Sequence, residues 1–569
     1  MQFSLLYPTG RERIESQLTD ESINDLSIDF LLDALTDIRY ERDHMKKVMT
    51  SITNDEEVIR YRCDIFDDFL RFPQLRDAME ELVRKLADLK DLERFQKDQE
   101  APVLWSLINR LREINDYVTC INMMKTTLES LDIQSQGMKE LLSIVTDISR
   151  ESGFEELKAD IDETMKKAAR LRSITIGVNL DSLLRPKTAG IISLNDFEFY
   201  DSGLMKRFMT FAQNKDELNS DMNTESKTRF HPMTSGNLNL GVSEMRLNLS
   251  KQDVHFETSG LTGGDPLSSA IKKPVTDIMK RTVNDIKFTL KRYVNISGYS
   301  LTSLMPEIIF YVRWAELVSK IMKTGMPMCK AQILPSSLRE LHFEGVYNLK
   351  LAINKVKGEE IDIITNDIDF DDRYRIFILT GPNRGGKTIF TQAVGLAVLL
   401  SQWGIYVPAK SAAISPCDNI YTHFPADEND TVDLGRLGEE SQRLSQIFDV
   451  ATEKSMLLLN ESLATTSVAE GLFIAKDVVK AMRYLGVRSI FNTHMHDLAR
   501  RKDELNDSTE GSSVIESLVT GVNEGKRSFK VAIIPPQGMS YAKDIAERYG
   551  VTFSTIKNHI DQKAQANKE

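Results

Sequence analysis

Residues 381–388 carry the clearest chemical signature in this chain. They read Gly-Pro-Asn-Arg-Gly-Gly-Lys-Thr, follow an apolar stretch at residues 376–379 and precede a run with helical character. A loop of this composition between a strand and a helix is the pattern that binds nucleotide phosphates. Its glycines let backbone N–H groups wrap the phosphates at the positive end of the helix. The predicted phosphate-binding residues are Gly381, Pro382, Asn383, Gly385, Gly386, Lys387 and Thr388.

Two of these side chains have specific predicted roles. Lys387 would neutralise the β and γ oxygens of a nucleotide, and the Thr388 hydroxyl would hold Mg²⁺. The sequence therefore predicts ATP and Mg²⁺ as the ligands of this site.

Residues 457–462 read Leu-Leu-Leu-Asn-Glu-Ser and would place two polar side chains at the end of a buried strand. Most nucleotide hydrolysis sites of this architecture have Asp and then Glu at these positions. Asn460 has a carbonyl oxygen that can bind Mg²⁺ but lacks the negative charge of aspartate. This predicts a Mg²⁺ affinity about 10–100-fold lower than with aspartate. Glu461 retains the carboxylate that a general base needs.

A third apolar stretch, "VRSIFNTHMHDL", ends at Thr493 and His494. A histidine at the end of such a strand can reach the γ-phosphate, so His494 is a predicted catalytic residue beside Glu461. His496, two residues further along, is assigned no functional role. Together these residues predict a site that hydrolyses its nucleotide slowly rather than an inactive one.

Short strands and helices must hold these side chains in place. They alternate from about residue 335 to residue 545, which predicts an α/β domain with a mostly parallel sheet. An amphipathic helix at residues 438–451 is expected just before the strand that carries Asn460.

The N-terminal half of the chain has a helical pattern instead, strongest over residues 55–172. A second long helix is expected at residues 103–128, and both long helices are interpreted as parts of a core-facing bundle. Apolar residues that recur at steps of three and four form the first stripe, namely Leu75, Met79, Leu82, Leu86 and Leu89.

The pattern changes to predicted strands at residues 173–196, with Pro186 and Gly190 as breaks between them. A polar, loop-rich stretch at residues 200–270 is interpreted either as a mobile insertion or as a small β-rich subdomain. Its basic side chains either are solvated or contact phosphates. Long helices are expected again at residues 273–325. The C-terminal segment predicts two short helices joined at Gly550.

Composition limits the class of protein. The 569 residues carry a net charge of −12, with 41% hydrophobic and 27% charged residues, as in ordinary globular proteins. No membrane span or secretion signal is expected. The four cysteines are far apart and lack CxxC spacing, which fits a cytoplasmic location. The acidic balance argues against a generally basic surface but does not exclude nucleic acid as a partner.

These motifs resemble those of the MutS family of ABC-type ATPases. The segments "TGPNRGGKT", "LLLNESLATTSVAEGLFIAKDVV" and "IFNTHMHDL" are similar to the family's phosphate loop, hydrolysis strand and switch. Residues 173–196 and "RYVNISGYSLTSLMPEIIFYVRWAELVSKI" resemble its lever and connector core, and "SYAKDIAERYGV" is similar to its C-terminal helix-turn-helix. The resemblance covers about residues 50–560.

The resemblance implies a multidomain fold and further site residues. The implied domains are a helical N-terminal segment (1–50), a helical core and lever (51–345) with a clamp-like insertion at about 200–270, an ATPase domain (346–545) and a helix-turn-helix tail (546–569). It also implies that Asn366 lies on the adenine side. Thr431 would be the signature hydroxyl, acting on the nucleotide of a second subunit. A homodimer that binds duplex or branched DNA is therefore expected.

The sequence also departs from the family pattern. Too few residues precede the lever for the family's mismatch-reading domain, so direct mismatch recognition is not expected. The aromatic residue of the adenine-side segment is replaced by Ile363. Two functions remain open: an ATP-dependent DNA clamp in repair or recombination, and an ATP-gated scaffold for protein assembly with weak or no hydrolysis.

Overall fold

The computed structural model describes residues 3–96, 104–150, 158–163, 172–180, 186–195, 303–382, 385–425, 435–463, 468–523, 526–536 and 549–566, with a few isolated positions between them. Backbone contacts divide the chain into two units. The first comprises Met1–Val83, Thr126–Ser143 and Ser303–Glu569, and the second comprises Arg84–Lys125 and Ile144–Thr302. The domain boundaries expected from the motifs divide the chain differently and stay a prediction.

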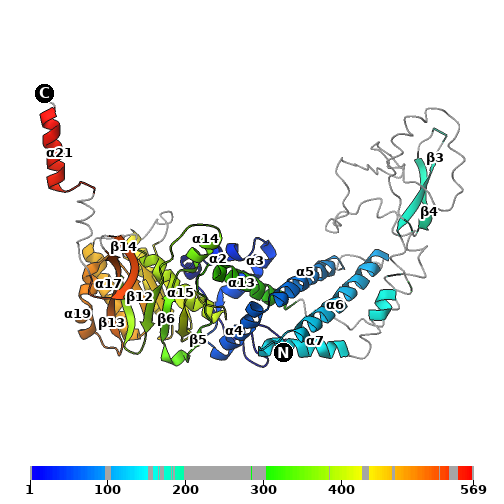
Figure 1. Ribbon diagram of the computed structural model, residues 1–569, viewed down its shortest axis with the longest axis horizontal. Helices are drawn as coiled ribbons and strands as arrows, with labels where there is room; N and C mark the ends of the chain where they lie inside the picture. The colour runs from blue at the N-terminus through cyan, green and yellow to red at the C-terminus, as the bar shows by residue number, and fades with distance from the viewer. Residues whose placement is uncertain are drawn as a thin grey trace. The chain divides into compact units, whose positions relative to one another are not determined.

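A six-stranded sheet in the first unit carries the predicted site. Its order is β10-β11-β12-β8-β13-β14, and neighbouring strands from β10 to β13 are parallel while β14 runs antiparallel to β13 (Figure 1). The strands are β8 (Tyr374–Thr380), β10 (Ile420–His423), β11 (Met456–Asn460), β12 (Arg488–Asn492), β13 (Val514–Asn523) and β14 (Lys526–Ile533). The expected α/β domain with a mostly parallel sheet is confirmed.

Alternate residues of the central strands enter different layers of the core. Ile376 and Ile378 of β8 pack in one cluster with Leu457 and Leu459 of β11 and with apolar residues from several helices. These helices are α16 (Gly435–Val450), α17 (Val468–Leu485), α18 (His496–Arg500) and α19 (Lys502–Asp507). Helix α15 (Lys387–Gln402) contacts β11 and β12 and is buried along most of its length.

A second, four-stranded sheet of order β5-β9-β6-β7 also belongs to this unit. Its strands are β5 (Gln332–Ile333), β6 (Leu341–Val346), β7 (Asn366–Phe370) and β9 (Ser411–Ile414), and helix α14 (Leu349–Val356) follows β6. Phe370 of β7 packs edge-to-face on Phe377 of β8 with ring centroids 4.9 Å apart, which joins the two sheets.

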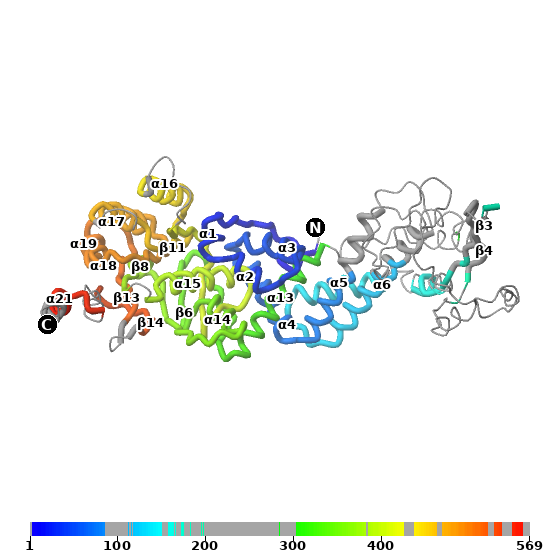
Figure 2. Tube along the Cα trace, turned by 90° about the horizontal axis from the view of Figure 1, so that it is seen from above, coloured from blue at the N-terminus to red at the C-terminus, as the bar shows by residue number. Residues whose placement is uncertain are grey.

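The N-terminal segment is helical, as predicted, and packs on the same unit. It contains α1 (Asp20–Asp25), α2 (Ile28–Leu35) and α3 (Arg39–Met49), with a small pairing of β1 (Ser16–Gln17) and β2 (Ser51–Ile52). Leu26 and Leu458 approach Gly395 of α15 so closely that a Cβ there would lie within 3.0 Å of both side chains. Figure 2 shows α1 beside α15. The phosphate-loop helix is therefore held partly by residues from the start of the chain.

Residues 273–302 of the helical stretch predicted at 273–325 lie almost entirely outside the described residues. The long helices expected in the described part of the chain are present. They are α4 (Glu56–Arg71), α5 (Pro73–Gln96), α6 (Leu104–Ser130), α7 (Gln136–Arg150) and α13 (Met305–Lys323). Leu75, Met79 and Leu82 of the predicted stripe are buried, and α6 matches the helix predicted at residues 103–128. No helix of the described residues is long and apolar enough to cross a membrane.

The strands predicted at residues 173–196 form an antiparallel pair, β3 (Ser173–Leu180) and β4 (Pro186–Asn195). Pro186 begins β4, as a break should, but the interpretation of Gly190 as a break is wrong. Gly190 lies inside β4 opposite Gly177, where two residues without side chains face each other.

Two further predictions concern residues that lie partly or wholly outside the described part of the chain. The insertion at residues 200–270 lies outside the described residues. At the C-terminus, α21 (Phe553–Ala566) follows Gly550, whose φ is 69°. The first of the two short helices predicted there also lies outside the described part of the chain.

Candidate nucleotide site

The phosphate loop connects β8 to the first residue of α15. Gly381 has a φ of 148° and Gly386 a φ of 86°, conformations that favour glycine. A Cβ on Gly381 would lie 2.0 Å from Oγ1 of Thr520, and one on Gly385 would lie 2.7 Å from the carbonyl oxygen of Pro382. The backbone geometry thus requires the glycines on which the sequence argument rested. Asn383 lies outside the described residues.

Lys387 is buried at the start of α15, with 4% of its surface exposed. Its Nζ donates hydrogen bonds to the carbonyl oxygens of Gly381 (3.2 Å) and Pro382 (3.3 Å). The same nitrogen lies 3.5 Å from Oε1 of Glu461. Because the loop carbonyls and Glu461 surround the ammonium group, it is oriented within the loop.

Parallel pairing of β11 and β12 brings the two predicted strand ends together. Asn460 is in register with Asn492, and the Glu461 N–H donates to the Asn492 carbonyl oxygen at 2.8 Å. Glu461 has a φ of 52°, so the chain turns sharply as it leaves β11. The structure therefore groups Lys387, Glu461 and the residues that follow β12.

Asn460 accepts two hydrogen bonds at its single side-chain oxygen. Thr388 Oγ1 donates to Asn460 Oδ1 at 2.8 Å, so the two residues predicted to hold Mg²⁺ lie together, and their metal-binding role stays a prediction. Asn492 Nδ2 donates to the same oxygen. The sequence analysis missed Asn492, although its place just before Thr493 and His494 was a usable signal.

Glu461 and His494 form a close pair, with Oε2 of the carboxylate 2.6 Å from Nδ1 of the imidazole. Burial raises the pKa of Glu461, but the hydrogen bond with His494 and the charge of Lys387 outweigh this, so the pKa lies below its usual value. The same hydrogen bond raises the pKa of His494. As the pH rises, the imidazole therefore keeps its proton beyond its ordinary range and loses it only above its usual value of 6.5.

His496, which was assigned no role, begins α18 and is partly buried. Burial, followed by the charges of Arg500 and Lys387, lowers its pKa. Its Nδ1 has no hydrogen-bond partner among the described residues.

The oxygens around Thr388 suit a hard cation such as Mg²⁺. Mg²⁺ keeps several waters and is usually held by one or two protein oxygens together with substrate phosphates. Thr388 Oγ1 and Asn460 Oδ1 provide such oxygens, without a formal charge. Within the described residues, no group of three or more His, Cys, Asp or Glu side chains could hold a metal ion without a nucleotide.

Asn366 does not join the residues around Lys387. It lies in β7, where its Oδ1 accepts from the Val531 N–H at 2.8 Å and its Nδ2 donates to the Phe529 carbonyl oxygen at 3.3 Å. It thereby braces β14, and β14 places the Phe529 ring against the phosphate loop. The ring lies 3.1 Å from where a Cβ on Gly386 would stand. Phe529 was not predicted to lie at the site, because it belongs to no recognisable local motif.

Thr431, the predicted signature hydroxyl, lies outside the described residues. The elements on either side of it are β10 and α16.

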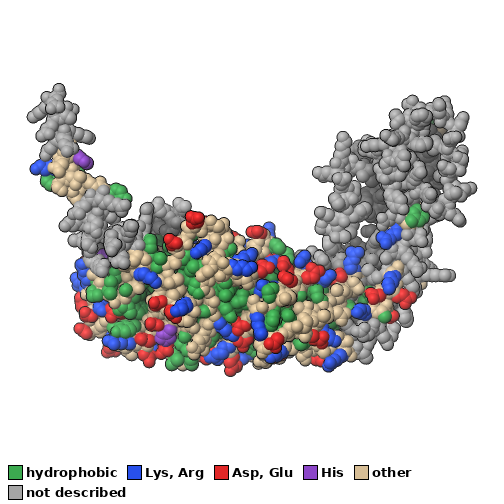
Figure 3. All heavy atoms as spheres, in the orientation of Figure 1, with side chains coloured by type: hydrophobic (Ala, Val, Ile, Leu, Met, Phe, Trp, Pro, Cys, Tyr) green, Lys and Arg blue, Asp and Glu red, His purple; other side chains and the backbone are tan. Residues whose placement is uncertain are grey.

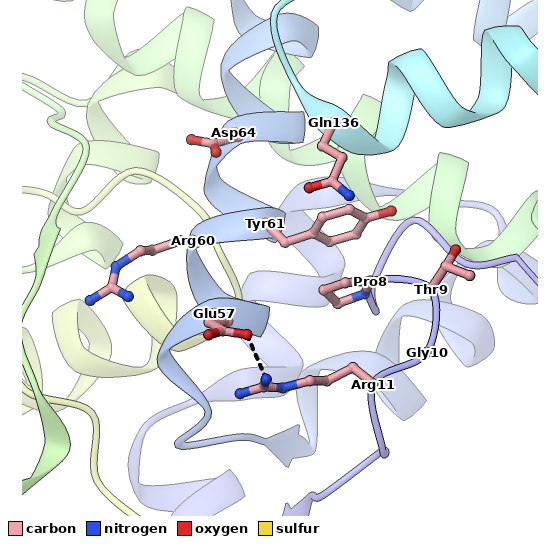
Figure 4. Close-up of a pocket in the computed structure, with 9 residues that line it drawn as sticks. All are labelled: Pro8, Thr9, Gly10, Arg11, Glu57, Arg60, Tyr61, Asp64 and Gln136. Carbon is pink, nitrogen blue, oxygen red and sulfur yellow. Dashed lines mark ion pairs between the residues drawn. The ribbon is translucent and has the colours of Figure 1, made fainter.

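A separate hollow lies between the N-terminal loop and α4 and is not part of this site. Arg11 and Glu57 form an ion pair across it, and the Tyr61 ring lies in its middle (Figure 4). Arg11 also contacts Asp55 at 2.7 Å. Arg11 is thus paired with two carboxylates, so its charge is not available to a phosphate.

Comparisons with known proteins agree with this arrangement. A family model of MutS domain V matches residues 377–550, and one of the MutS2 N-terminal domain matches residues 54–324. The DNA mismatch repair protein MutS of Chlorobium chlorochromatii is 32% identical over 208 residues, which cover 34% of this chain and 24% of that protein. MutS of Chlorobium limicola is 36% identical over 192 residues (32% and 22%). MutS of Acetivibrio thermocellus is 37% identical over 162 residues (28% and 18%). The match spans about a quarter of the length of these relatives or less.

Proposed function

Because the chain belongs to the MutS family, we propose that it is an ATPase that controls a DNA-binding clamp. It would act in repair or recombination on duplex or branched DNA, without reading mismatches directly. The observation that carries this proposal is the group of Lys387, Thr388, Glu461 and His494 around one phosphate loop.

In the proposed mechanism, loop N–H groups and Lys387 bind the phosphates of ATP. Mg²⁺, held through Thr388 and Asn460, would supply positive charge at the phosphate oxygens. Glu461 accepts a proton from the attacking water, and its low pKa keeps the carboxylate ionised for this role. His494 lies on the other side of the Glu461 carboxylate from Lys387 and would donate a hydrogen bond to the γ-phosphate.

The proposal includes a homodimer in which Thr431 of one subunit completes the site of the other. Native mass measurement with a non-hydrolysable ATP analogue, with and without a four-way DNA junction, tests this step. We expect the dimer to increase with the analogue and to take up DNA. A chain that binds the analogue but stays monomeric in both conditions would contradict the dimeric mechanism.

DNA binding is expected to depend strongly on salt, since protein contacts to phosphates release counterions. The described surface in Figure 3 intersperses Lys and Arg with Asp and Glu and shows no continuous basic face in that view. Failure of junction, mismatched and plain duplexes to bind at about 50 mM salt, with or without ATP, would overturn the DNA part of the proposal.

Replacing Asn460 by aspartate should increase hydrolysis about tenfold or more, equivalent to about 1.4 kcal/mol of transition-state stabilisation. The carboxylate would accept the hydrogen bonds of Thr388 and Asn492 as the amide oxygen does. It would also add a negative charge where Mg²⁺ is proposed to bind. The Mg²⁺ concentration for half-maximal rate should fall about 10–100-fold. Steady-state ATPase assays over a Mg²⁺ titration measure both quantities. An unchanged rate and Mg²⁺ requirement would mean that the missing charge does not limit hydrolysis.

Replacing Phe529 by alanine should weaken ATP binding about fivefold to tenfold, which corresponds to the lower end of the about 1–3 kcal/mol that stacking on an aromatic ring contributes. The ring borders the loop at Gly386 and is 42% exposed, so a nucleotide can contact it. Equilibrium titration with a fluorescent ATP analogue measures the change. Phe473→Ala is the matched control, because Phe473 is a 71% exposed ring on α17. Equal affinities of the two variants would exclude Phe529 from the nucleotide site.

A further inference from the structure

A buried pair of side chains, His423 and Ser462, lies directly behind Glu461. His423 ends β10 and Ser462 follows Glu461, and each has 1% of its surface exposed. Nδ1 of His423 lies 2.7 Å from Oγ of Ser462, and this hydroxyl oxygen is also 3.1 Å from the His423 carbonyl oxygen. Ser462 ends the stretch 457–462 but was assigned no role there, and His423 belongs to none of the motifs from which the site was predicted.

The hydrogen-bond geometry defines how this pair is protonated. A serine hydroxyl has one proton, and donating it to the His423 carbonyl leaves the oxygen free to accept from the imidazole. Nδ1 then carries the proton, and the bare Nε2 has no hydrogen-bond partner among the described residues. The opposite tautomer would bury an unpaired N–H, which costs more than a bare ring nitrogen.

This pair resembles a serine–histidine nucleophile, but its burial excludes that role. A nucleophilic oxygen must reach a substrate, and the Ser462 hydroxyl is enclosed and already bonded to His423 at both its donor and acceptor positions. Burial, together with the charge of Arg443, also lowers the pKa of His423 to about 4. The imidazole is therefore a neutral, fixed hydrogen-bond donor over the physiological pH range.

The segment that the pair holds is strained. Glu461 and Leu463 both have left-handed backbone conformations, with φ of 52° and 63°. Such conformations are unfavourable in residues other than glycine and persist only where neighbours fix them. Three contacts fix this turn: Glu461 N–H to Asn492, Ser462 to His423, and Leu463 N–H to Glu440 Oε2 at 2.7 Å.

We propose that His423 is a positioning residue that acts through Ser462 to hold the left-handed turn that directs the Glu461 carboxylate at Lys387 and His494. Glu440 supports the same turn from α16. His423 ends β10, before the segment that contains Thr431, and Glu440 lies in α16, after it. The residues that orient Glu461 therefore belong to the two elements that flank this segment in the chain. This inference rests on the proposed ATPase function for its catalytic consequence only.

The test compares His423→Leu, which removes the donor, with His423→Asn, whose amide nitrogen can replace Nδ1. The first readout is the pKa of His494, followed by NMR of ¹³C-labelled histidines, because contact with Glu461 raises that pKa. Glu461→Gln defines the value without the carboxylate. We expect His423→Leu to shift the pKa of His494 most of the way to that value and His423→Asn to leave it near wild type.

The second readout is hydrolysis. In His423→Leu, kcat should fall about 10- to 100-fold, as a misplacement of about 1 Å can produce, while affinity for a non-hydrolysable ATP analogue stays close to wild type. Ser462→Ala removes one oxygen atom and should reproduce both effects. In the double variant with His423→Leu, the pKa of His494 and kcat should stay close to those of His423→Leu alone, because both changes remove the same contact. The smaller change, Ser462→Ala, keeps the test valid if His423→Leu unfolds.

An unchanged His494 pKa in folded His423→Leu or Ser462→Ala protein would overturn the inference. A wild-type chain without ATP hydrolysis would instead contradict the proposed function, and the NMR titration would still decide whether His423 positions Glu461.

Discussion

Replacement of Lys387 by methionine is expected to weaken ATP binding about 100-fold or more. Methionine has nearly the same length but no charge, so the loop keeps its backbone amides and loses the ammonium group. Hydrogen bonds to charged groups contribute about 1.5–3 kcal/mol each. Losing those to both the β and γ oxygens therefore costs about 3 kcal/mol or more, and each 1.4 kcal/mol corresponds to about tenfold in affinity. Lys387 is buried and already directed into the loop by the Gly381 and Pro382 carbonyls. Isothermal titration with ATP and Mg²⁺ measures the loss.

Lys410→Met is the matched control for this variant. Lys410 is an exposed lysine whose ammonium pairs with Glu344 of β6, outside the phosphate loop. Its replacement should leave ATP affinity unchanged. Thermal unfolding of Lys387→Met shows whether a loss of binding reflects a loss of structure. We expect the variant to stay folded, because Glu461 keeps His494 as a partner for its charge. A folded Lys387→Met protein that binds ATP as tightly as the control would show that the phosphates bind elsewhere.

The local elements of the site could be predicted from the sequence because their signals are local. The glycines, Lys387 and Thr388 lie within eight residues of one another, and an apolar strand and a helix flank them. Asn460, Glu461 and His494 could be placed because each ends a recognisable apolar strand. The strand-end geometry of a parallel sheet then brings them together.

The residues that support the site could not be predicted, because their roles depend on strand register and tertiary packing. Asn492 contacts Asn460 only because β11 and β12 pair in one particular register. His423 reaches Ser462 across 39 residues of sequence, and Phe529 reaches Gly386 because Asn366 braces β14. No hydrophobic period or motif specifies such contacts.

The placement of the N-terminal segment was beyond sequence analysis for the same reason. A helical pattern predicts that the segment is helical but not which surface it covers. Gln392 of α15 donates to the Asp25 carbonyl oxygen at 2.8 Å, and Ser22 Oγ donates to the Ile420 carbonyl oxygen at 2.8 Å. These contacts connect positions separated by 367 and 398 residues. The first attaches the segment to the helix that carries Lys387 and the second attaches it to β10, so truncating it would affect the nucleotide site.

Replacement of Glu461 by glutamine should separate hydrolysis from binding. The amide keeps the shape of the side chain but cannot accept a proton, so kcat should fall about 10²–10⁴-fold. ATP affinity should stay the same or increase, because Glu461 lies 3.5 Å from Lys387 and competes with phosphates for its ammonium group. Glu453→Gln is the control, since Glu453 is an exposed carboxylate paired with Arg339. Single-turnover hydrolysis and equilibrium binding, measured on the same preparations, give both quantities. Hydrolysis at the wild-type rate would remove Glu461 as the base, whereas a parallel loss of binding would assign it to the phosphate loop instead.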